Sequence, residues 1–99
     1  MKKVRLSDHA REDLDEIWLS IAVDNVTAAD GLIDRLETLL QRLLQFPDMG
    51  ASRDEIRPGV RSFPCGNYLV FYRSMDYGIA VVRVVWGGRD LKALEHPPE

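Results

Sequence analysis

The sequence predicts an α+β fold in which a helical hairpin packs on one face of a small, mostly antiparallel sheet. Two amphipathic segments come early in the chain, and three segments rich in β-branched and aromatic residues follow, separated by turn residues. A helix pair and a sheet that each have an apolar side must bury those sides against each other. With 99 residues, the chain has the length of one domain, so we expect residues 1–99 to form a single unit.

The first part of the chain predicts a short strand and then a helix. Residues 2–6 alternate polar and apolar side chains, as a strand does. Ser7 is suited to cap a helix over residues 8–23, and Asp8 lies in its first turn, where the helix dipole favours negative charge. One apolar stripe runs along this helix: Ala10, Leu14, Ile17, Trp18, Ile21 and Ala22.

A second helix is expected to start at Thr27, with Asp30 three residues later as a variant of the capping box. It should end before Pro47, which cannot continue a helix. The connection between the helices is only about three residues, so the helices must run antiparallel. Its apolar face is wide: Leu32, Ile33, Leu36, Leu39, Leu40, Leu43 and Leu44.

The rest of the chain predicts three strands in an antiparallel meander. We expect a loop over 51–59, strands over 60–63, 68–73 and 79–86, and a hairpin turn at Gly66 and Asn67. The last strand is β-branched almost throughout, which is typical of a strand inside a sheet. The element order is therefore β-α-α-β-β-β. Residues 90–94 could add one closing helical turn.

Composition excludes several classes of protein. Apolar residues make up 45% and charged residues 29% of the chain, with no apolar run long enough to span a membrane. No signal-peptide pattern opens the sequence, and the lone Cys65 cannot form an intrachain disulfide, so we expect a cytoplasmic protein. No Cys/His cluster predicts a metal site, and Gly87 and Gly88 lack the context of a phosphate loop. We therefore expect neither metal nor cofactor.

The charge is unevenly distributed. The net charge is −3, with acidic residues concentrated in residues 1–45 and five arginines in residues 56–90. The acidic front half would repel a phosphate backbone, so we do not expect direct, sequence-specific DNA binding by this chain alone. The arginine-bearing strands are the part suited to an anionic partner.

Five motifs follow one another along nearly the whole chain. Each is short, and their specificity comes from their order. They are Leu6-Ser7 with the acidic run 12–18, then 43–50, 57–64, 68–73 and 82–90.

In this order the motifs resemble the ParE branch of the RelE/ParE superfamily of bacterial type II toxins. The resemblance implies a toxin that is neutralised by a small ParD-like antitoxin encoded beside it. Relatives of RelE cleave mRNA on the ribosome, whereas relatives of ParE are known as inhibitors of DNA gyrase. A fold does not determine which of these functions a protein has, so the choice between them depends on the residues.

The residues favour binding over catalysis. Metal-independent RNA cleavage needs a proton acceptor, a proton donor and cations. The sequence places His9 in the first turn of the first helix, away from the arginine strands, and Trp86 stands where RelE-type nucleases often carry a His or Tyr. We therefore predict no catalytic residues. In the alternative of a ribosome-dependent endoribonuclease, the set would be Arg61, Arg73, Arg83 and Tyr72.

The preferred hypothesis is non-covalent inhibition of DNA gyrase through the arginine-bearing sheet. The target-binding residues would be Arg61, Arg73, Arg83, Trp86 and Arg89. Structural alternatives stay open: each arginine could pair with an acid on the helices, Trp86 could lie in the sheet core, and Arg89 could pair with Asp90. A third hypothesis is a homologue that has lost toxicity and only binds antitoxins.

Two apolar residues do not fit the core stripe of the first helix. Leu19 and Val23 lie one turn apart on its far side. An exposed pair at this spacing is typical of a partner surface. We predict that Leu19 and Val23 contact the antitoxin, while the helical acids form a solvated face.

Overall fold

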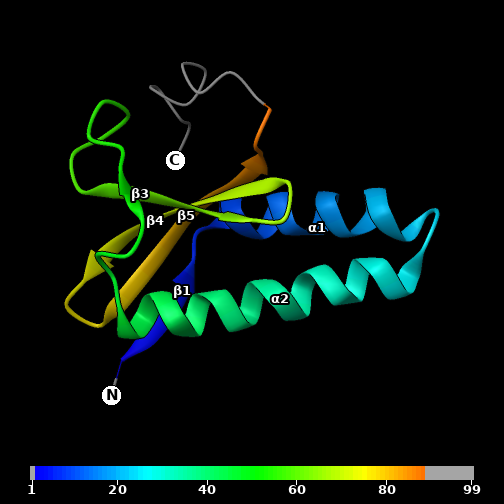
Figure 1. Ribbon diagram of the computed structural model, residues 1–99, viewed down its shortest axis with the longest axis horizontal. Coiled ribbons are helices and arrows are strands. Elements are labelled where there is room, and N and C mark those ends of the chain that lie inside the picture. The colour runs from blue at the N-terminus through cyan, green and yellow to red at the C-terminus, as the bar shows by residue number, and fades with distance from the viewer. Residues whose placement is uncertain (1, 89–99) are drawn as a thin grey trace.

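The computed structural model describes residues 2–88, which form two layers: a helical hairpin and a five-stranded sheet (Figure 1). The order of the strands across the sheet is β1-β5-β4-β3-β2. β1 runs parallel to β5, and every other pairing is antiparallel. The elements are β1 Lys3–Leu6, α1 Asp8–Ala22, α2 Val26–Gln45, β2 Ala51–Ser52, β3 Val60–Cys65, β4 Tyr68–Met75 and β5 Gly78–Trp86.

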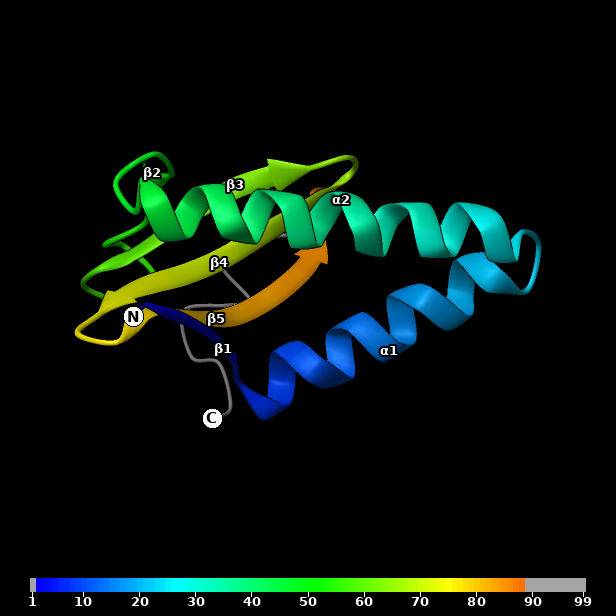
Figure 2. The same ribbon diagram turned by 90° about the horizontal axis from the view of Figure 1, so that it is seen from below.

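Both helices cover the same face of the sheet, and the end of the hairpin extends past the sheet (Figures 1 and 2). The predicted α+β class, element order and meander are thus confirmed. No helix within residues 2–88 is both long and apolar enough to cross a membrane.

The helix starts differ in how well the sequence predicted them. Ser7 caps α1 as expected, since its hydroxyl accepts a hydrogen bond from the Ala10 N–H at 3.0 Å. The predicted start of α2 was wrong, because Asn25 is the cap and accepts from the Ala28 N–H at 3.0 Å. Asp30 instead accepts a hydrogen bond from the Trp18 indole. Asn ranks slightly above Thr as an N-cap, so the preference of the single residue favours Asn25, and the spacing of Thr27 and Asp30 does not mark a capping box here.

The sheet is larger than expected. Residues 51–59 were predicted as loop, but Ala51 and Ser52 form β2 and pair with β3. β3 also extends beyond Phe63 to Cys65, up to the predicted turn. β5 lies inside the sheet as predicted, with β1 on one side and β4 on the other. Gly78 permits the close approach of β1, because its φ of 139° suits glycine and a Cβ there would collide with the Lys3 backbone.

The core lies mainly between the helices and the sheet. Its fully buried members include Leu43, Val70, Tyr72 and Ile79. A smaller cluster lies on the opposite face of the sheet. There Val60, Phe71 and Val85 pack with the partly buried Ile56, Leu69 and Val82. β4 is therefore buried on both faces, while the helix-free face stays open near β1.

Candidate functional site

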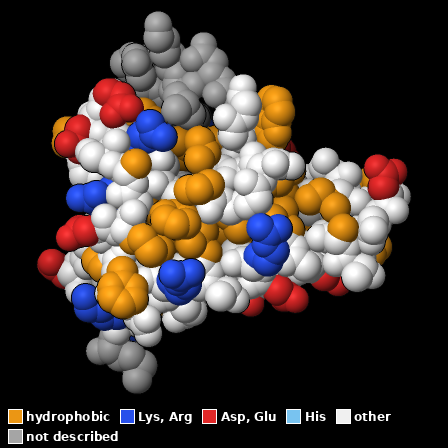
Figure 3. Space-filling model, in the orientation of Figure 1, with side chains coloured by type: hydrophobic (Ala, Val, Ile, Leu, Met, Phe, Trp, Pro, Cys, Tyr) orange, Lys and Arg blue, Asp and Glu red, His pale blue; other side chains and the backbone are white. Residues whose placement is uncertain are grey.

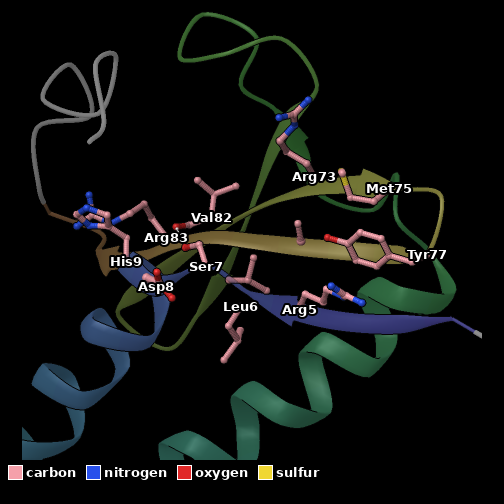
Figure 4. Close-up of a pocket in the computed structure, with 12 residues that line it drawn as sticks. Arg5, Leu6, Ser7, Asp8, His9, Arg73, Met75, Tyr77, Val82 and Arg83 are labelled. Atoms are coloured by element: carbon pink, nitrogen blue, oxygen red, sulfur yellow. Dashed lines mark hydrogen bonds between the residues drawn. The ribbon is translucent and has the colours of Figure 1, made fainter. Parts of the chain in front are cut away.

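A cleft of about 440 Å³ lies on the helix-free face, where β1, β5 and β4 run side by side (Figure 4). Arg5 of β1 is the register partner of Ala80 on β5, and Ala80 is the register partner of Arg73 on β4. Residues paired in this way share one face of the sheet. Tyr72 packs against the helices, and successive side chains of a strand point to opposite faces, so the next residue, Arg73, points away from them. The row formed by Arg5, Ala80 and Arg73 therefore lies on the helix-free face. Two guanidinium-bearing side chains thus flank one small residue.

The cleft has an aromatic end and a helical end (Figure 4). At the aromatic end, the Arg5 guanidinium lies 4.9 Å from the centre of the Tyr77 ring, beside Met75. This stacking fixes the direction of Arg5 without neutralising it. At the helical end, Ser7, Asp8, His9 and Arg83 line the cleft.

Ser7 holds the helical end of the cleft in place. Besides capping α1, its backbone N–H donates to the Val81 carbonyl at 3.0 Å and its hydroxyl donates to the Val82 carbonyl at 2.8 Å. The first turn of α1 is therefore fixed to β5. This corrects the expectation that His9 lies away from the arginine strands, since it lines the same cleft as Arg73 and Arg83.

Arg83 forms a buried pair with Asp13 of α1. Its Nε and Nη2 donate to the two carboxylate oxygens at 2.8 and 3.0 Å, and both side chains are only 12% exposed. Asp13 also accepts from the Val84 N–H at 3.0 Å, on the edge of β5 that β1 leaves uncovered. These hydrogen bonds are the first cause of a raised Arg83 pKa, so the guanidinium stays charged. Asp13, predicted on the solvated face, is thus a structural residue.

Arg73 and Arg83 are not cross-strand partners. Arg83 is the register partner of Phe71, and the register shifts between Phe71 and Tyr72 so that Val82 is an additional residue on β5. Val82 lines the cleft beside the helical end. The Arg73 side chain has no hydrogen bond or ion pair to another residue within 2–88, and the same is true of the Arg5 side chain apart from its stacking on Tyr77. Among the residues that line the cleft, Arg5 and Arg73 are therefore cations available to a ligand.

Arg61 and Tyr72 hold the turn that follows α2. The Tyr72 hydroxyl accepts from the Gly50 N–H at 2.9 Å and donates to the Pro47 carbonyl at 2.8 Å. Arg61 donates to the Gly50 carbonyl at 2.8 Å and lies 3.7 Å from the Asp48 carboxylate. A Cβ at Gly50 would come within 2.8 Å of the Ser62 carbonyl oxygen, so glycine is required there.

This geometry argues against proton transfer by Tyr72. The side chain is fully buried, and burial is the largest cause of its raised pKa. Its hydroxyl proton and acceptor site are both used within the fold. A phosphate could not reach it without opening the core, so the proposed nuclease set loses its tyrosine. Cys65 is buried too, and desolvation raises the pKa of its thiol, which makes it a poor nucleophile.

Trp86 lies on the surface at the end of β5. Its side chain is 60% exposed, so the alternative that places it in the sheet core is wrong. A Cβ at Gly88 would overlap the indole, so the ring lies over that glycine. Arg89, the last predicted target-binding residue, falls outside residues 2–88, as do its suggested pair with Asp90 and the closing helical turn.

The far end of the hairpin carries apolar residues on its surface. Leu19 is 59% exposed and Val23 83% exposed, and Val26 at the start of α2 is exposed beside them. Along the same hairpin, a groove of about 530 Å³ is lined by apolar and acidic side chains, among them Trp18 and Asp30. Figure 3 shows hydrophobic side chains gathered in a band that runs from the sheet onto the hairpin, with acidic side chains at the edge of the hairpin.

The sequence did not single out Arg5 or Ala80 as site residues. Arg5 stands in a four-residue strand, and Ala80 is one small residue in an apolar run. The alternation of Val4, Arg5 and Leu6 does indicate that Arg5 points away from the core. Which strand it would lie beside depends on the parallel pairing of β1 with β5, and no local signal specifies that pairing. Among residues 2–88, no group of His, Cys, Asp and Glu could hold a metal ion.

Comparison with known proteins begins with the fold. The solved structure described as "Chromosomal ParDE TA system from P. aeruginosa" matches with a TM-score of 0.72. The match covers 87% of this chain and 96% of that chain, at 22% sequence identity. The two-layer arrangement is thus a known fold.

Similarity in sequence identifies the family. Toxin ParE3 of Caulobacter vibrioides is 32% identical over 82 residues, which cover 82% of each chain. Toxin ParE1 of Mycobacterium tuberculosis is 37% identical over 83 residues, covering 81% of this chain and 84% of its own. Residues 4–91 match the family model described as the ParE toxin of the type II toxin-antitoxin system parDE. This chain belongs to the ParE toxin family.

Proposed function

We propose that this toxin acts in the cytoplasm by binding DNA gyrase non-covalently, and that a ParD-like antitoxin neutralises it. The target surface would be the cleft on the helix-free face together with Trp86. Arg5 and Arg73 would supply the charge there, since Arg61 and Arg83 are used within the fold. The role of gyrase rests on the resemblance to ParE toxins.

The observation that carries this proposal is the arrangement of the cleft. Two guanidinium groups without a carboxylate partner in the described chain stand over an apolar floor, and an exposed tryptophan ends the same strand β5 further along the sheet. Exposed Trp and Arg are the residues that most often anchor a protein partner. The net charge of −3 would weaken association with bare RNA or DNA, whereas it does not hinder docking of a protein.

Supercoiling of a relaxed plasmid by purified gyrase tests the proposal. The native toxin should suppress supercoiling or cause cleaved DNA to accumulate. The double variant Arg5→Gln/Arg73→Gln should lose most of this effect while keeping its fold, because Arg5 is exposed and the half-buried Arg73 side chain has no ion pair within residues 2–88. Arg11→Gln is the matched control, since Arg11 is an exposed arginine on α1 outside the cleft. Uninhibited gyrase at a large excess of native toxin would refute the proposal.

His9 supports a second candidate function. Histidine ordinarily exchanges protons near neutral pH, and His9 shares a cleft with two available arginines. A ribosome-dependent nuclease could use it as an acid or base, with Arg5 and Arg73 around the phosphate. His9→Asn should then abolish mRNA cleavage after induction. A gyrase inhibitor should instead keep most of its effect in this variant and leave mRNA intact.

The far end of the hairpin is the proposed antitoxin surface. Leu19 and Val23 expose enough apolar area, with Val26 beside them, to anchor an antitoxin helix. Leu19→Asp with Val23→Asp should weaken antitoxin binding without unfolding the toxin, as isothermal titration and circular dichroism would show. Glu37→Gln, at an exposed position on α2 away from Leu19 and Val23, is the control. Unchanged antitoxin affinity in the double variant would exclude this surface.

A further inference from the structure

The row formed by Arg5, Ala80 and Arg73 has the geometry of a carboxylate site. Neighbouring strands lie about 4.8 Å apart, so the backbones that carry the two arginines are separated by roughly 10 Å. In the strand register only Ala80 lies between them, and its methyl group leaves the cleft open above β5. An acidic side chain above Ala80 would therefore have a guanidinium on each side.

We propose that this cleft docks an extended, acidic segment of a partner protein, with one carboxylate held over Ala80 between Arg5 and Arg73. Apolar side chains next to that carboxylate would contact Met75 on one side and Val82 on the other, since both line the cleft. This inference rests on the proposed function in so far as that function makes the target a protein.

Charge complementarity favours an acidic partner. Arg5 and Arg73 line the same cleft, and like charges on one sheet face repel. Within residues 2–88, the carboxylate that lines this cleft is that of Asp8, at its helical end. An anion that binds between them removes this repulsion and gains charge-assisted hydrogen bonds. The cation–π contact with Tyr77 already fixes the direction of Arg5, which reduces the entropy lost on binding.

The rest of the lining favours a peptide over a nucleic acid. Between the arginines and toward both ends, the cleft is lined by Met75, Ala80, Val82 and the ring of Tyr77. A phosphate backbone gains little from such apolar surface, whereas a peptide with mixed acidic and apolar side chains uses both parts. The acidic face of the helices would also repel a long polyanion, but it lies on the other side of the sheet from a short peptide.

Binding to defined probes would test this directly. The probe is a nonapeptide that alternates glutamate and leucine, compared with its glutamine counterpart and with single-stranded oligothymidylate. Amide NMR of the whole chain should show shifts centred on Arg5, Ala80 and Arg73 with the glutamate peptide. Arg5→Gln and Arg73→Gln should each weaken binding about tenfold. Ala80→Leu should abolish it by filling the site, and Arg11→Gln should leave it unchanged.

The other outcomes would overturn the proposal. Equal binding of the glutamine peptide would show that charge is not recognised, and stronger binding of oligothymidylate would make the cleft a nucleic-acid site. Shifts confined to other surfaces would also exclude it. Plasmid supercoiling separates this inference from the proposed function. If the native toxin leaves gyrase active while the peptide still binds in the cleft, gyrase is not the target but acidic docking stands. If gyrase is inhibited equally by the Ala80→Leu variant, the target binds elsewhere.

Discussion

Two groups of arginines on the sheet serve different purposes. Arg83 is bound to Asp13 of α1, and Arg61 is bound to the Gly50 carbonyl in the turn after α2. On the open face near β1, Arg5 and Arg73 have no such partners within the described chain. The bound arginines stabilise the fold. The available arginines keep positive charge at the surface, where it can attract an anionic ligand.

This difference shows why strand arginines must be sorted by their partners before a role is assigned. Removing one member of a buried pair leaves an uncompensated charge in the core and is strongly destabilising. Removing an exposed cation costs little or nothing. Substitutions in the two groups of arginines should therefore separate stability from function.

The largest effect is expected at Asp13. Asp13→Ala removes both hydrogen bonds to Arg83 and the acceptor for the Val84 N–H, leaving a charge and an N–H unpaired. We expect a loss of about 3 kcal/mol in the free energy of unfolding, measured by urea denaturation. Asp15→Ala, at an exposed position on α1, is the control and should change stability by less than about 0.5 kcal/mol. Similar losses in both variants would contradict the structural role of this pair.

A smaller loss of stability is expected at Tyr72. Tyr72→Phe keeps the packing of the ring but leaves the Gly50 N–H without its acceptor and the Pro47 carbonyl without its donor. The free energy of unfolding should fall by about 1–3 kcal/mol. Tyr77→Phe is the matched control, because that ring contacts Arg5 through its face and its hydroxyl makes no hydrogen bond to any residue within 2–88. No loss in Tyr72→Phe would mean that the turn is held in another way.

The pH dependence of stability sharpens the same comparison. Burial raises the Tyr72 pKa above its ordinary value of 10.0, so the folded state holds the phenol proton more tightly than the unfolded chain. The contribution of this raised pKa to the free energy of unfolding is therefore fully present below pH 10 and is lost as the pH rises through the pKa of Tyr72 in the folded state. The stability difference between the native protein and Tyr72→Phe should shrink above pH 10. A difference that stays constant would show that Tyr72 does not ionise on unfolding.

The smallest effect on stability is expected on the open face. Arg73→Ala removes one of two like charges and, within residues 2–88, no side-chain hydrogen bond or ion pair, so the free energy of unfolding should change by less than about 0.5 kcal/mol. Inhibition of the target should nevertheless fall strongly. A large loss of stability would place Arg73 with Arg61 and Arg83 among the structural arginines and remove it from the target surface.

Much of the fold could be predicted because its signals are local. The cap at Ser7, the stripe of α1 and the turn at Gly66 and Asn67 each depend on residues a few positions apart. The start of α2 was misplaced because Asn25 and Thr27 are both acceptable caps within the same few residues. The short strand β2 was missed, since two residues make no pattern and only the neighbouring β3 defines them.

The candidate site was predicted only in part, because its members come from distant parts of the chain. Arg73 was identified from the sequence. The pair of Arg83 with Asp13 could not be predicted from spacing, because the two residues are seventy positions apart. His9 and Arg5 reach the cleft through the parallel pairing of β1 with β5 and the hydrogen bonds of Ser7 to that strand. Pairing of this kind is determined by the packing of the whole domain.

The sequence by itself determined the secondary structure and the existence of arginine-bearing strands, because periodicity, capping and turn preference act over one or two turns of chain. Only the tertiary structure decided which arginines are bound and which are available, because an ion pair depends on which groups meet in space. The same reasoning holds for Tyr72 and Trp86. Both are aromatic residues in strand-forming sequence. The fold buries Tyr72, where its hydroxyl makes hydrogen bonds, and leaves Trp86 exposed at the end of β5.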